Sequence, residues 1–562
     1  MRYLPFTSLY DKYPVYHRTD AQAEVFEQST VFDRLKELSG TIILTTDVGV
    51  DLDALETALS QVLPSDQIFN IETLALAPHA YDQRVSPYVT EDRVFGFKTT
   101  LSMHDLYIPD LVETVKKMNK RVIYGFGAGL IPGDHLIHVT IKRYEHQRRM
   151  RQGMPNFNVD NPQEDVLRKY KRAYFLEWVI QDSFIRSIQD RISYLIEWND
   201  RAHPKMVDYP AFRRHLQGLT QQPFRMVPFF DAGVWGGQWL KELADLNGDV
   251  PNYAWCFDGV MEENSIALAI NDVVFDVPAQ TLIQHYPEEV LGKKVFQQYG
   301  YNLPIRFDLL DTMDGQNLSL QVHPNATYIH QTFGMPYTQE ESYYILDAKE
   351  DAHVYLGLKS DINVTDFQRD LRASQVTQEF NAEAYVNRFS AKKHDHFSIP
   401  PGTIHCSGKN ILVLEISTAA YIFTFKLWDW GRLGLDGEPR PVNIEHGLKN
   451  MDYTMTTDVV ASTLINPITR LSPSMEKTGL HPSQSLDSYR ITIEDEVTVD
   501  LQETVQMANL VEGTRIEIYD ALTQEKMMDI HYAETFVIPA SVHRLTFKAP
   551  VGPCMLMLAE MR

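Results

Sequence analysis

Hydrophobic and polar positions follow two different patterns along the chain, and the pattern changes near residue 221. Before that point, apolar runs alternate with stretches in which apolar residues recur at helical spacing, as in the run 41–46 and the stretch 52–62 that follows it. Strands that alternate with helices are typical of a parallel sheet, so we expect an α/β unit over residues 1–220. Further strands are expected at 121–124 and 135–141, and further helices at 142–152 and 164–187.

From residue 221 onward the chain is rich in short β-branched runs with proline and glycine between them. Strands of this length are typical of a jelly roll or sandwich. A helical pattern at about 363–387 interrupts them. We therefore expect a β-rich core over 221–470 and a second, smaller barrel over 471–562. The strands expected in the core are 272–277, 319–322, 343–346, 353–358, 411–416 and 421–427, and those in the last block are 489–493, 498–501, 515–519, 535–539 and 555–558.

Composition narrows the class of protein. The chain has 562 residues, which is too long for one ordinary core, and 44% hydrophobic residues, which fits a folded protein. Its net charge of −23 argues against binding to nucleic acid or to an anionic membrane, because both require clustered basic surface. A local pocket can still take an anionic small molecule. The sequence does not indicate an oligomeric state.

The cysteines and the apolar windows bear on the compartment. Cys256, Cys406 and Cys554 are too few and too scattered for a disulfide framework, and none has the CxxC spacing of a thiolate metal site. The first residues lack the apolar stretch of a signal peptide, and no window of membrane-spanning length is apolar throughout. We therefore expect a cytoplasmic protein.

Four residues in the β-rich core have side chains that suit one divalent metal ion. Gln321 and His323 are two positions apart, so both project to the same face of a strand. Glu341 begins a later expected strand, and His405 follows a Pro-Pro-Gly turn that can hold an imidazole rigidly. Two imidazoles, a carboxylate and an amide oxygen suit Zn²⁺, with Mn²⁺, Fe²⁺ or Co²⁺ as alternatives. Taken singly, each of these residues is more often an ordinary surface or backbone-bonded side chain; the combination indicates a metal site.

His394 and His396 are alternative candidates for the metal site, because they also alternate along an expected strand. They precede the Pro-Gly turn instead of following it. We therefore interpret them as surface groups or as groups that surround the ligands, and we assign the site to the other four residues.

Several motifs around these residues occur in the order found in one known family. The segment 317–324 contains Gln-Val-His-Pro, and 401–405 reads Pro-Gly-Thr-Ile-His. Val234-Trp235-Gly236-Gly237 precedes them, and Leu427 to Arg432 follows. Over roughly residues 223–562 the chain resembles the type I mannose-6-phosphate isomerases of the cupin superfamily. The resemblance implies a cupin jelly roll with one metal site.

The resemblance also implies a reaction. Such an enzyme interconverts mannose 6-phosphate and fructose 6-phosphate through a cis-enediol, which requires an electrophile and a base that carries a proton between C1 and C2. Glu415 resembles a glutamate proposed as the acid/base of the family, although it could instead lie on the outer face of a barrel strand. Lys426 and Arg432 correspond to cations expected near the reacting oxygens or the phosphate.

Two positions depart from the family pattern. Lys426 stands where an arginine is common, and it keeps the charge but loses the bidentate fork. Gln339 stands where a lysine usually precedes the acidic ligand, so one charge is missing. These changes leave two alternatives open: a non-catalytic sensor that binds a sugar phosphate, and a related cupin that acts on another sugar derivative.

The first 220 residues resemble the outline of a P-loop nucleoside or uridine kinase. The loop 46–51 has no lysine and a single glycine, so it does not match the phosphate-binding motif. The glycine-containing turn 125–129 is a weak signal. We interpret this region as a degenerate kinase-like domain with a structural, oligomerising or regulatory task. The basic residues Arg143, Arg148, Arg149 and Arg151 are expected on a solvated helix face.

Overall fold

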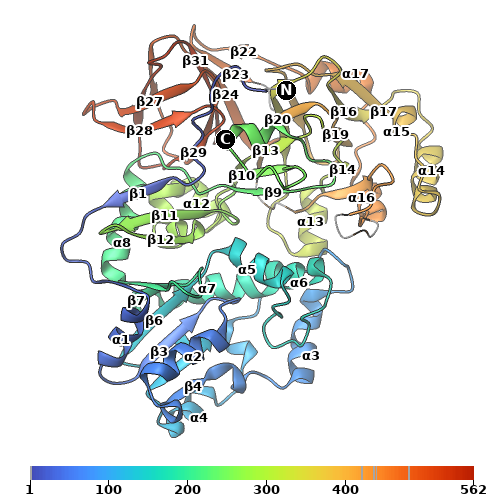
Figure 1. Ribbon diagram of the computed structural model, residues 1–562. Coiled ribbons are helices and arrows are strands. Elements are labelled where there is room, and N and C mark those ends of the chain that lie inside the picture. Colours follow the sequence, from blue (N-terminus) through green and yellow to red (C-terminus); the bar gives the residue numbers. More distant parts are fainter. Residues whose placement is uncertain (1–2, 419, 421, 435–436, 438–439, 479–480) are drawn as a thin grey trace.

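The computed structural model describes residues 3–418, 420, 422–434, 437, 440–478 and 481–562 (Figure 1). In this view an α/β unit at the bottom, coloured blue to teal, lies below two β-rich parts. Among the described residues, no helix is both long enough and apolar enough to cross a membrane. The domain boundaries expected at residues 220 and 470 stay predictions.

The α/β unit is built on a seven-stranded sheet in which five strands run parallel. Parallel strands buried on both faces explain the almost continuous apolar runs in this part of the sequence. In spatial order the strands are β2 (Val25–Glu27), β8 (Lys205–Asp208), β7 (Ile192–Glu197), β6 (His135–Thr140), β3 (Ile42–Thr46), β5 (Val122–Phe126) and β4 (Ile68–Asn70); the first two are antiparallel to their neighbours.

Helices cover both faces of this sheet, because apolar side chains recur on one side of each helix. On one face lie α1 (Ser29–Glu37) and α2 (Leu52–Val62), and on the other α3 (Pro78–Val89), α4 (Leu111–Met118) and α7 (Trp178–Ile188). The charged segments of the sequence form α5 (Arg143–Arg151) and α6 (Val166–Arg172), and a π-helical turn, Ala173–Glu177, joins α6 to α7. The unit ends with α8 (Tyr209–Gly218).

The first residues of the chain lie with the β-rich part instead of with the α/β unit. Strand β1 (Val15–Arg18) pairs in parallel with β11 (Ser265–Ile270), which pairs with β12 (Val273–Pro278). The backbone N–H of Tyr3 donates to Glu242 in the same part of the molecule. Short helices lie on either side of β11 and β12 in the chain. Helix α9 (Trp239–Leu243) precedes the two strands, and α10 (Gln280–His285), α11 (Pro287–Leu291) and α12 (Lys293–Tyr299) come after them.

The central part consists of two antiparallel sheets that pack face to face around one core. The first sheet contains β18 (His396–Ile399), β15 (Glu341–Ala348), β20 (Ile411–Thr418), β13 (Ile305–Asp311), β10 (Trp255–Gly259) and β9 (Phe229–Asp231), and the second contains β17 (Val386–Ser390), β16 (His353–Leu358), β19 (His405–Ser407), β14 (Leu320–Val322) and β21 (Phe425–Trp428). The helices of this part are α13 (Ala326–Phe333), α14 (Val364–Thr377), α15 (Ala382–Tyr385), α16 (Ile444–Asn450) and α17 (Thr457–Thr463). Residue 421, at which the strand expected at 421–427 begins, lies outside the described residues.

The alternation along β20 decides which side chains face the interior. Ile411 and Val413 pack in the central core, whereas Leu412 and Leu414 pack against the last block of the chain. Both faces of the strand are therefore apolar, and the period of two is hidden in the sequence. Glu415 continues the inner row and so faces the inside of the barrel.

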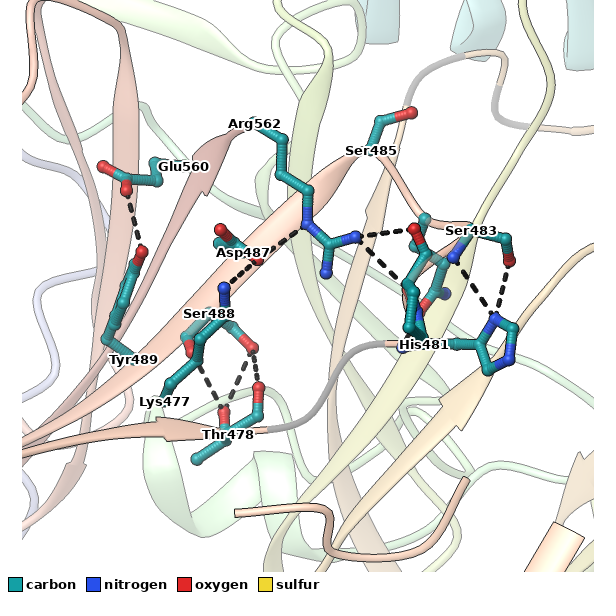
Figure 2. Close-up of polar contacts among 12 residues, drawn as sticks. Lys477, Thr478, His481, Ser483, Ser485, Asp487, Ser488, Tyr489, Glu560 and Arg562 are labelled. Atoms are coloured by element: carbon teal, nitrogen blue, oxygen red, sulfur yellow. Dashed lines mark hydrogen bonds and ion pairs between the residues drawn. The ribbon is translucent and has the colours of Figure 1, made fainter. Parts of the chain in front are cut away.

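The last block also forms two antiparallel sheets around a core of its own. They consist of β22 (Thr469–Arg470), β23 (Met475–Thr478), β24 (Leu486–Ile493), β31 (Cys554–Met561), β26 (Gln506–Glu512) and β29 (Thr535–Ile538), and of β25 (Glu496–Asp500), β30 (Arg544–Lys548), β27 (Arg515–Asp520) and β28 (Lys526–His531). Figure 2 shows Asp487 between Lys477 and Arg562, with ion pairs of 2.7 Å to each. Arg562 also donates to the backbone carbonyl of Pro482 at 2.9 Å, which fixes the segment before β24.

Candidate functional site

Three of the four predicted metal ligands form one buried cluster. His323, Glu341 and His405 are each at most 1% exposed, and their ligand atoms all lie within 4.8 Å of one another. The Nε2 atom of each imidazole approaches the same carboxylate oxygen, Glu341 Oε2, at 2.8 Å for His405 and in closer contact for His323. The structure thus brings together residues that are up to 82 positions apart in the sequence.

The backbone orients both imidazoles so that Nε2 is available. Nδ1 of His323 lies 3.0 Å from the carbonyl of Phe423, and Nδ1 of His405 lies 2.8 Å from that of Thr403. A carbonyl can only accept, so each Nδ1 donates to it, and Nε2 is the ring nitrogen that faces the centre of the cluster. This is the arrangement that metal-binding histidines require.

Electrostatics keep the carboxylate of the cluster ionised. Burial by itself would raise the pKa of Glu341, but the two imidazoles lower that pKa well below its usual range. A carboxylate and two imidazoles form a donor set that suits a divalent cation such as Zn²⁺. The residues present therefore fit a metal ion.

Gln321 lies at the edge of the same cluster. It is paired with His405 between β14 and β19, and its side-chain amide is 3.3 Å from His405 Nε2. On its other side it is paired with Lys426 of β21. These three side chains share the inner face of the second sheet, because the opposite face of that sheet packs on α16.

The Pro-Gly turn joins two of the ligand segments. Gly402 has φ +87°, and a Cβ there would lie 2.8 Å from the carbonyl of Asn450, so the turn requires glycine. The backbone N–H of Gly402 donates to the carbonyl of His323 at 3.0 Å. The turn thus fixes the position of His323 relative to His405.

The alternative histidines lie away from the cluster. His394 contacts Tyr344 and Glu512, and His396 contacts Ser342, which faces the opposite side of β15 from Glu341. Burial lowers the pKa of His396 to about 3, so this imidazole is neutral. Neither belongs to the three-residue cluster found among the described residues.

A pocket of about 420 Å³ adjoins the cluster. Glu415 lines it and is hydrogen-bonded to Glu341. Asp308 of β13 is the direct cross-strand neighbour of Glu415 and lines the same pocket. Burial, together with these two carboxyl groups, raises the pKa of Glu415 well above its usual range. The alternative interpretation, in which Glu415 lies on the outer face of a strand, does not agree with its position in the pocket.

The other predicted residues lie around this pocket in different ways. Gln339 lines it and is 6% exposed, and its Oε1 has no hydrogen-bond partner. Lys426 is half-buried two residues after the pocket-lining Thr424, and burial, with Arg440 nearby, lowers the pKa of Lys426 to about 7. Arg432 forms an ion pair with Asp429 and donates to the carbonyl of Asn317 at 2.7 Å. Lys426 and Arg432 are not among the described residues that line the pocket.

Sequence reasoning missed the other wall of the pocket. Gln147, Arg151 and Tyr170 of the α/β unit line it opposite the barrel.

The prediction of a solvated basic helix face was wrong for two of the arginines of α5. Arg149 is 2% exposed and pairs with Glu145 at 2.7 Å, while Arg143 is 10% exposed and pairs with Asp182 at 2.9 Å. Asp308 has no distinct signal in the sequence, because the segment 305–311 also contains Arg306 and Asp311.

Fold and site together define a β-barrel protein with a buried His-Glu-His cluster and an adjoining pocket. Comparison with known proteins adds relatives for this part. Mannose-6-phosphate isomerase ManA of Bacillus subtilis is 27% identical over 237 residues, which are 41% of this chain and 68% of that protein. Mannose-6-phosphate isomerase of Streptococcus mutans is 26% identical over 217 residues, which are 38% of this chain and 63% of that protein.

A crystal structure of the mannose 6-phosphate isomerase from Bacillus subtilis is similar with a TM-score of 0.49 and 19% identity, over 60% of this chain and 99% of that one. Residues 27–221 match a family model described as a domain of unknown function (DUF8485). The sequence relatives support the prediction of an isomerase-type enzyme. None of these matches is described as a kinase, so the kinase-like domain over residues 1–220 stays a prediction.

Proposed function

We propose that the chain is a metal-dependent aldose–ketose isomerase that interconverts mannose 6-phosphate and fructose 6-phosphate. The observation that carries the proposal is the buried cluster of His323, Glu341 and His405 beside a pocket that contains Glu415. Relatives named as mannose-6-phosphate isomerases support the choice of substrate. The pocket volume is in the range of small-molecule sites.

His323, Glu341, His405 and the amide of Gln321 would hold one divalent ion, which we propose is Zn²⁺. When bound, the ion supplies Lewis-acid chemistry that stabilises negative charge on the sugar oxygens at C1 and C2. The backbone carbonyls of Phe423 and Thr403 fix the tautomer of each imidazole, so the ligand geometry is established by folding.

Glu415 would transfer the proton between C1 and C2 through a cis-enediol. Its carboxyl group lines the pocket next to Glu341, and its raised pKa favours proton uptake. Burial is the main cause of the raised pKa, and Asp308 raises it further, because two facing carboxyl groups do not both ionise easily. Such a group can both remove and return a proton.

Lys426 and Arg432 are proposed to bind the substrate; Lys426 lies on β21, two residues after the pocket-lining Thr424. At position 339 the family pattern has a lysine, whereas Gln339 supplies no positive charge to the pocket. This loss favours the second candidate, a sensor that binds a sugar phosphate without converting it, or a related cupin that acts on another sugar derivative.

For the α/β unit we propose a degenerate kinase-like domain without phosphotransfer. The parallel sheet supports the likeness, but the site at the carboxyl end of β3 is occupied by the protein itself. Asp47 is hydrogen-bonded to His138 at 2.8 Å and to Thr140 at 2.6 Å. The N-terminus of α2 is capped by Asp51, which pairs with Arg201 at 2.7 Å. A nucleotide phosphate would meet carboxylates there.

The proposal is tested by measuring exchange of the C2 hydrogen of mannose 6-phosphate with solvent, using protein whose metal content has been determined. We expect exchange and formation of fructose 6-phosphate. Glu415→Gln should lower turnover by roughly 10²- to 10⁴-fold without changing the metal content, because proton transfer is lost while the ligands stay. Glu517→Gln on β27 is the matched control. Absence of exchange in the metal-loaded wild type, together with binding of the sugar phosphate, would establish the sensor instead.

A further inference from the structure

The pocket that contains Glu415 lies between the barrel and the α/β unit. Its barrel side is formed mainly by β9, β10, β13 and β20, and its other side by α5 and α6. In Figure 1 these two helices lie at the top of the α/β unit, against the β-rich part. The helical side contributes Gln147, Met150 and Arg151 from α5, and Val166, Leu167 and Tyr170 from α6.

Direct bonds hold both helices against the barrel at this pocket. Gln147 of α5 and Tyr170 of α6 each donate to the carboxylate of Glu263, Tyr170 at 2.8 Å. Glu263 is 5% exposed, so this bridge is buried. Tyr144 of α5 stacks on Phe229 of β9 with ring centroids 4.9 Å apart. The helical wall is therefore a fixed part of the pocket.

The charges along the pocket are distributed unevenly. Its inner end, next to the metal cluster, has the carboxyl groups of Glu415 and Asp308. Two cations occur among its described lining residues, Arg306 and Arg151. Arg306 is 3% exposed and forms an ion pair with Glu262. A phosphate carries about two negative charges at neutral pH, and the carboxyl groups of the inner end offer it no positive charge.

Arg151 differs from Arg306 in its freedom to change partner. Its side chain is 47% exposed, and its contact is an ion pair with Asp231, 32% exposed, at a distance of 3.3 Å. Such an exposed pair contributes little to stability, so a phosphate oxygen can replace the carboxylate at small cost. The guanidinium group can then bind phosphate through two parallel hydrogen bonds.

We propose that the α/β unit forms the outer wall of the substrate pocket and that Arg151 binds the phosphate group of the sugar phosphate at the pocket mouth. This inference rests on the proposed function for the identity of the substrate. It gives the first 220 residues a role in substrate selection. It also explains how the pocket takes an anion although Gln339 supplies no charge.

The test compares Arg151→Gln with Arg148→Gln in the full chain loaded with metal. Arg148 is on the same helix with the same side-chain exposure of 47%, but it pairs with Glu145 and is not among the described lining residues. We expect Arg151→Gln to raise KM for mannose 6-phosphate on the order of 10- to 100-fold, with kcat changed less than about twofold, because a charge-assisted bond made in both ground and transition states is lost. Arg148→Gln should leave both constants unchanged, and Arg151→Lys should recover part of the loss.

Different outcomes separate the two proposals. If the wild type is active and Arg151→Gln keeps its KM, the role of Arg151 is refuted while the isomerase stands. If the wild type shows no turnover, calorimetric titration with mannose 6-phosphate decides: weaker binding to Arg151→Gln than to Arg148→Gln supports the phosphate site, and equal binding, or none to either protein, refutes it.

Discussion

Glu177 is a carboxylic acid that folding places where water does not reach. It lies in the π-helical turn between α6 and α7, is 1% exposed, and accepts hydrogen bonds from the side chain of Asn156 at 3.0 Å and from the backbone of Phe157 at 2.9 Å. Burial raises the pKa of Glu177 to about 7 in spite of these bonds. Between pH 4.5 and about 7, the folded state therefore favours the protonated form of Glu177, whereas an unfolded chain favours the ionised form.

This shift predicts that stability decreases with rising pH. A group whose folded pKa is raised binds its proton more tightly in the native state, so stability falls as pH rises from the unfolded pKa of 4.5 to about 7 and then levels off. The loss for this one group is about 3 kcal/mol. Glu177→Gln removes the titrating group but keeps one acceptor oxygen for the two donors, so it loses one bond at both pH values. Its free energy of unfolding should therefore fall much less between pH 5 and pH 8 than that of the wild type.

Urea unfolding of the full chain at pH 5 and pH 8 measures the effect. The exposed Glu113→Gln on α4 is the control for removing one carboxylate. An equal difference between the two pH values in wild type and Glu177→Gln would show that Glu177 is ionised in the folded protein.

At the scale of elements, the last block of the chain supports the strand that bears Glu341. Gln484, in the segment before β24, donates to the backbone carbonyl of Glu341 at 2.8 Å and accepts from the hydroxyl of Ser398 at 2.6 Å. The next residue, Ser485, donates its backbone N–H to Glu340. Arg562 and Asp487 in turn hold this segment (Figure 2). The β-rich C-terminal block thus positions β15 at its first residue, Glu341, through a backbone bond.

We predict that Gln484→Ala weakens metal binding about 10-fold, because groups that fix ligands typically affect affinity by this order. His405→Ala, which removes a ligand, should abolish stoichiometric metal retention, and Gln502→Ala, exposed between β25 and β26, should change nothing. Competition with a chelator measures the affinities. Full metal retention in His405→Ala would mean that the ligand assignment is wrong, and unchanged affinity in Gln484→Ala would mean that the strand is positioned without this support.

At the scale of the whole molecule, the α/β unit and the barrel share an aromatic contact next to the metal cluster. Phe95 is 1% exposed and packs on Phe333, Phe423 and Phe425, with ring centroids 5.3 to 5.5 Å apart. The carbonyl of Phe423 is the group that orients His323. Packing between the units therefore reaches His323 through one residue.

Phe95→Ala should lower the free energy of unfolding by about 3–5 kcal/mol, as for other large-to-small changes in a core. It should also weaken metal binding, since Phe423 loses a packing partner. Phe32→Ala, in the core between α1 and the sheet, is the control, because it should reduce stability without affecting the metal. Both are followed by thermal unfolding and by chelator competition. Equal metal affinity in the two variants would show that the cluster is independent of the α/β unit.

Sequence patterns predicted the elements and the residues of the buried cluster better than they predicted the surroundings of single side chains. The period of two on strands placed Gln321 and His323 on one face, and local turn chemistry at Gly402 placed His405, because both depend on neighbours in the chain. By contrast, Arg149 was expected in solvent and is buried, with its guanidinium group bonded to the backbone carbonyls of Gly49, Trp198 and Asn199. These partners lie far away in the chain, so the local sequence does not reveal them.

The sequence by itself determined the alternation of strands and helices, the β-rich core and the four candidate ligands, because these follow from side-chain period and residue type. Only the tertiary structure decided that Glu415 faces inward beside Asp308, that His396 lies on the other face of β15, and that α5 and α6 close the pocket. Those facts depend on contacts between residues far apart in the chain. Their register and packing are set by the complete core and not by any single segment.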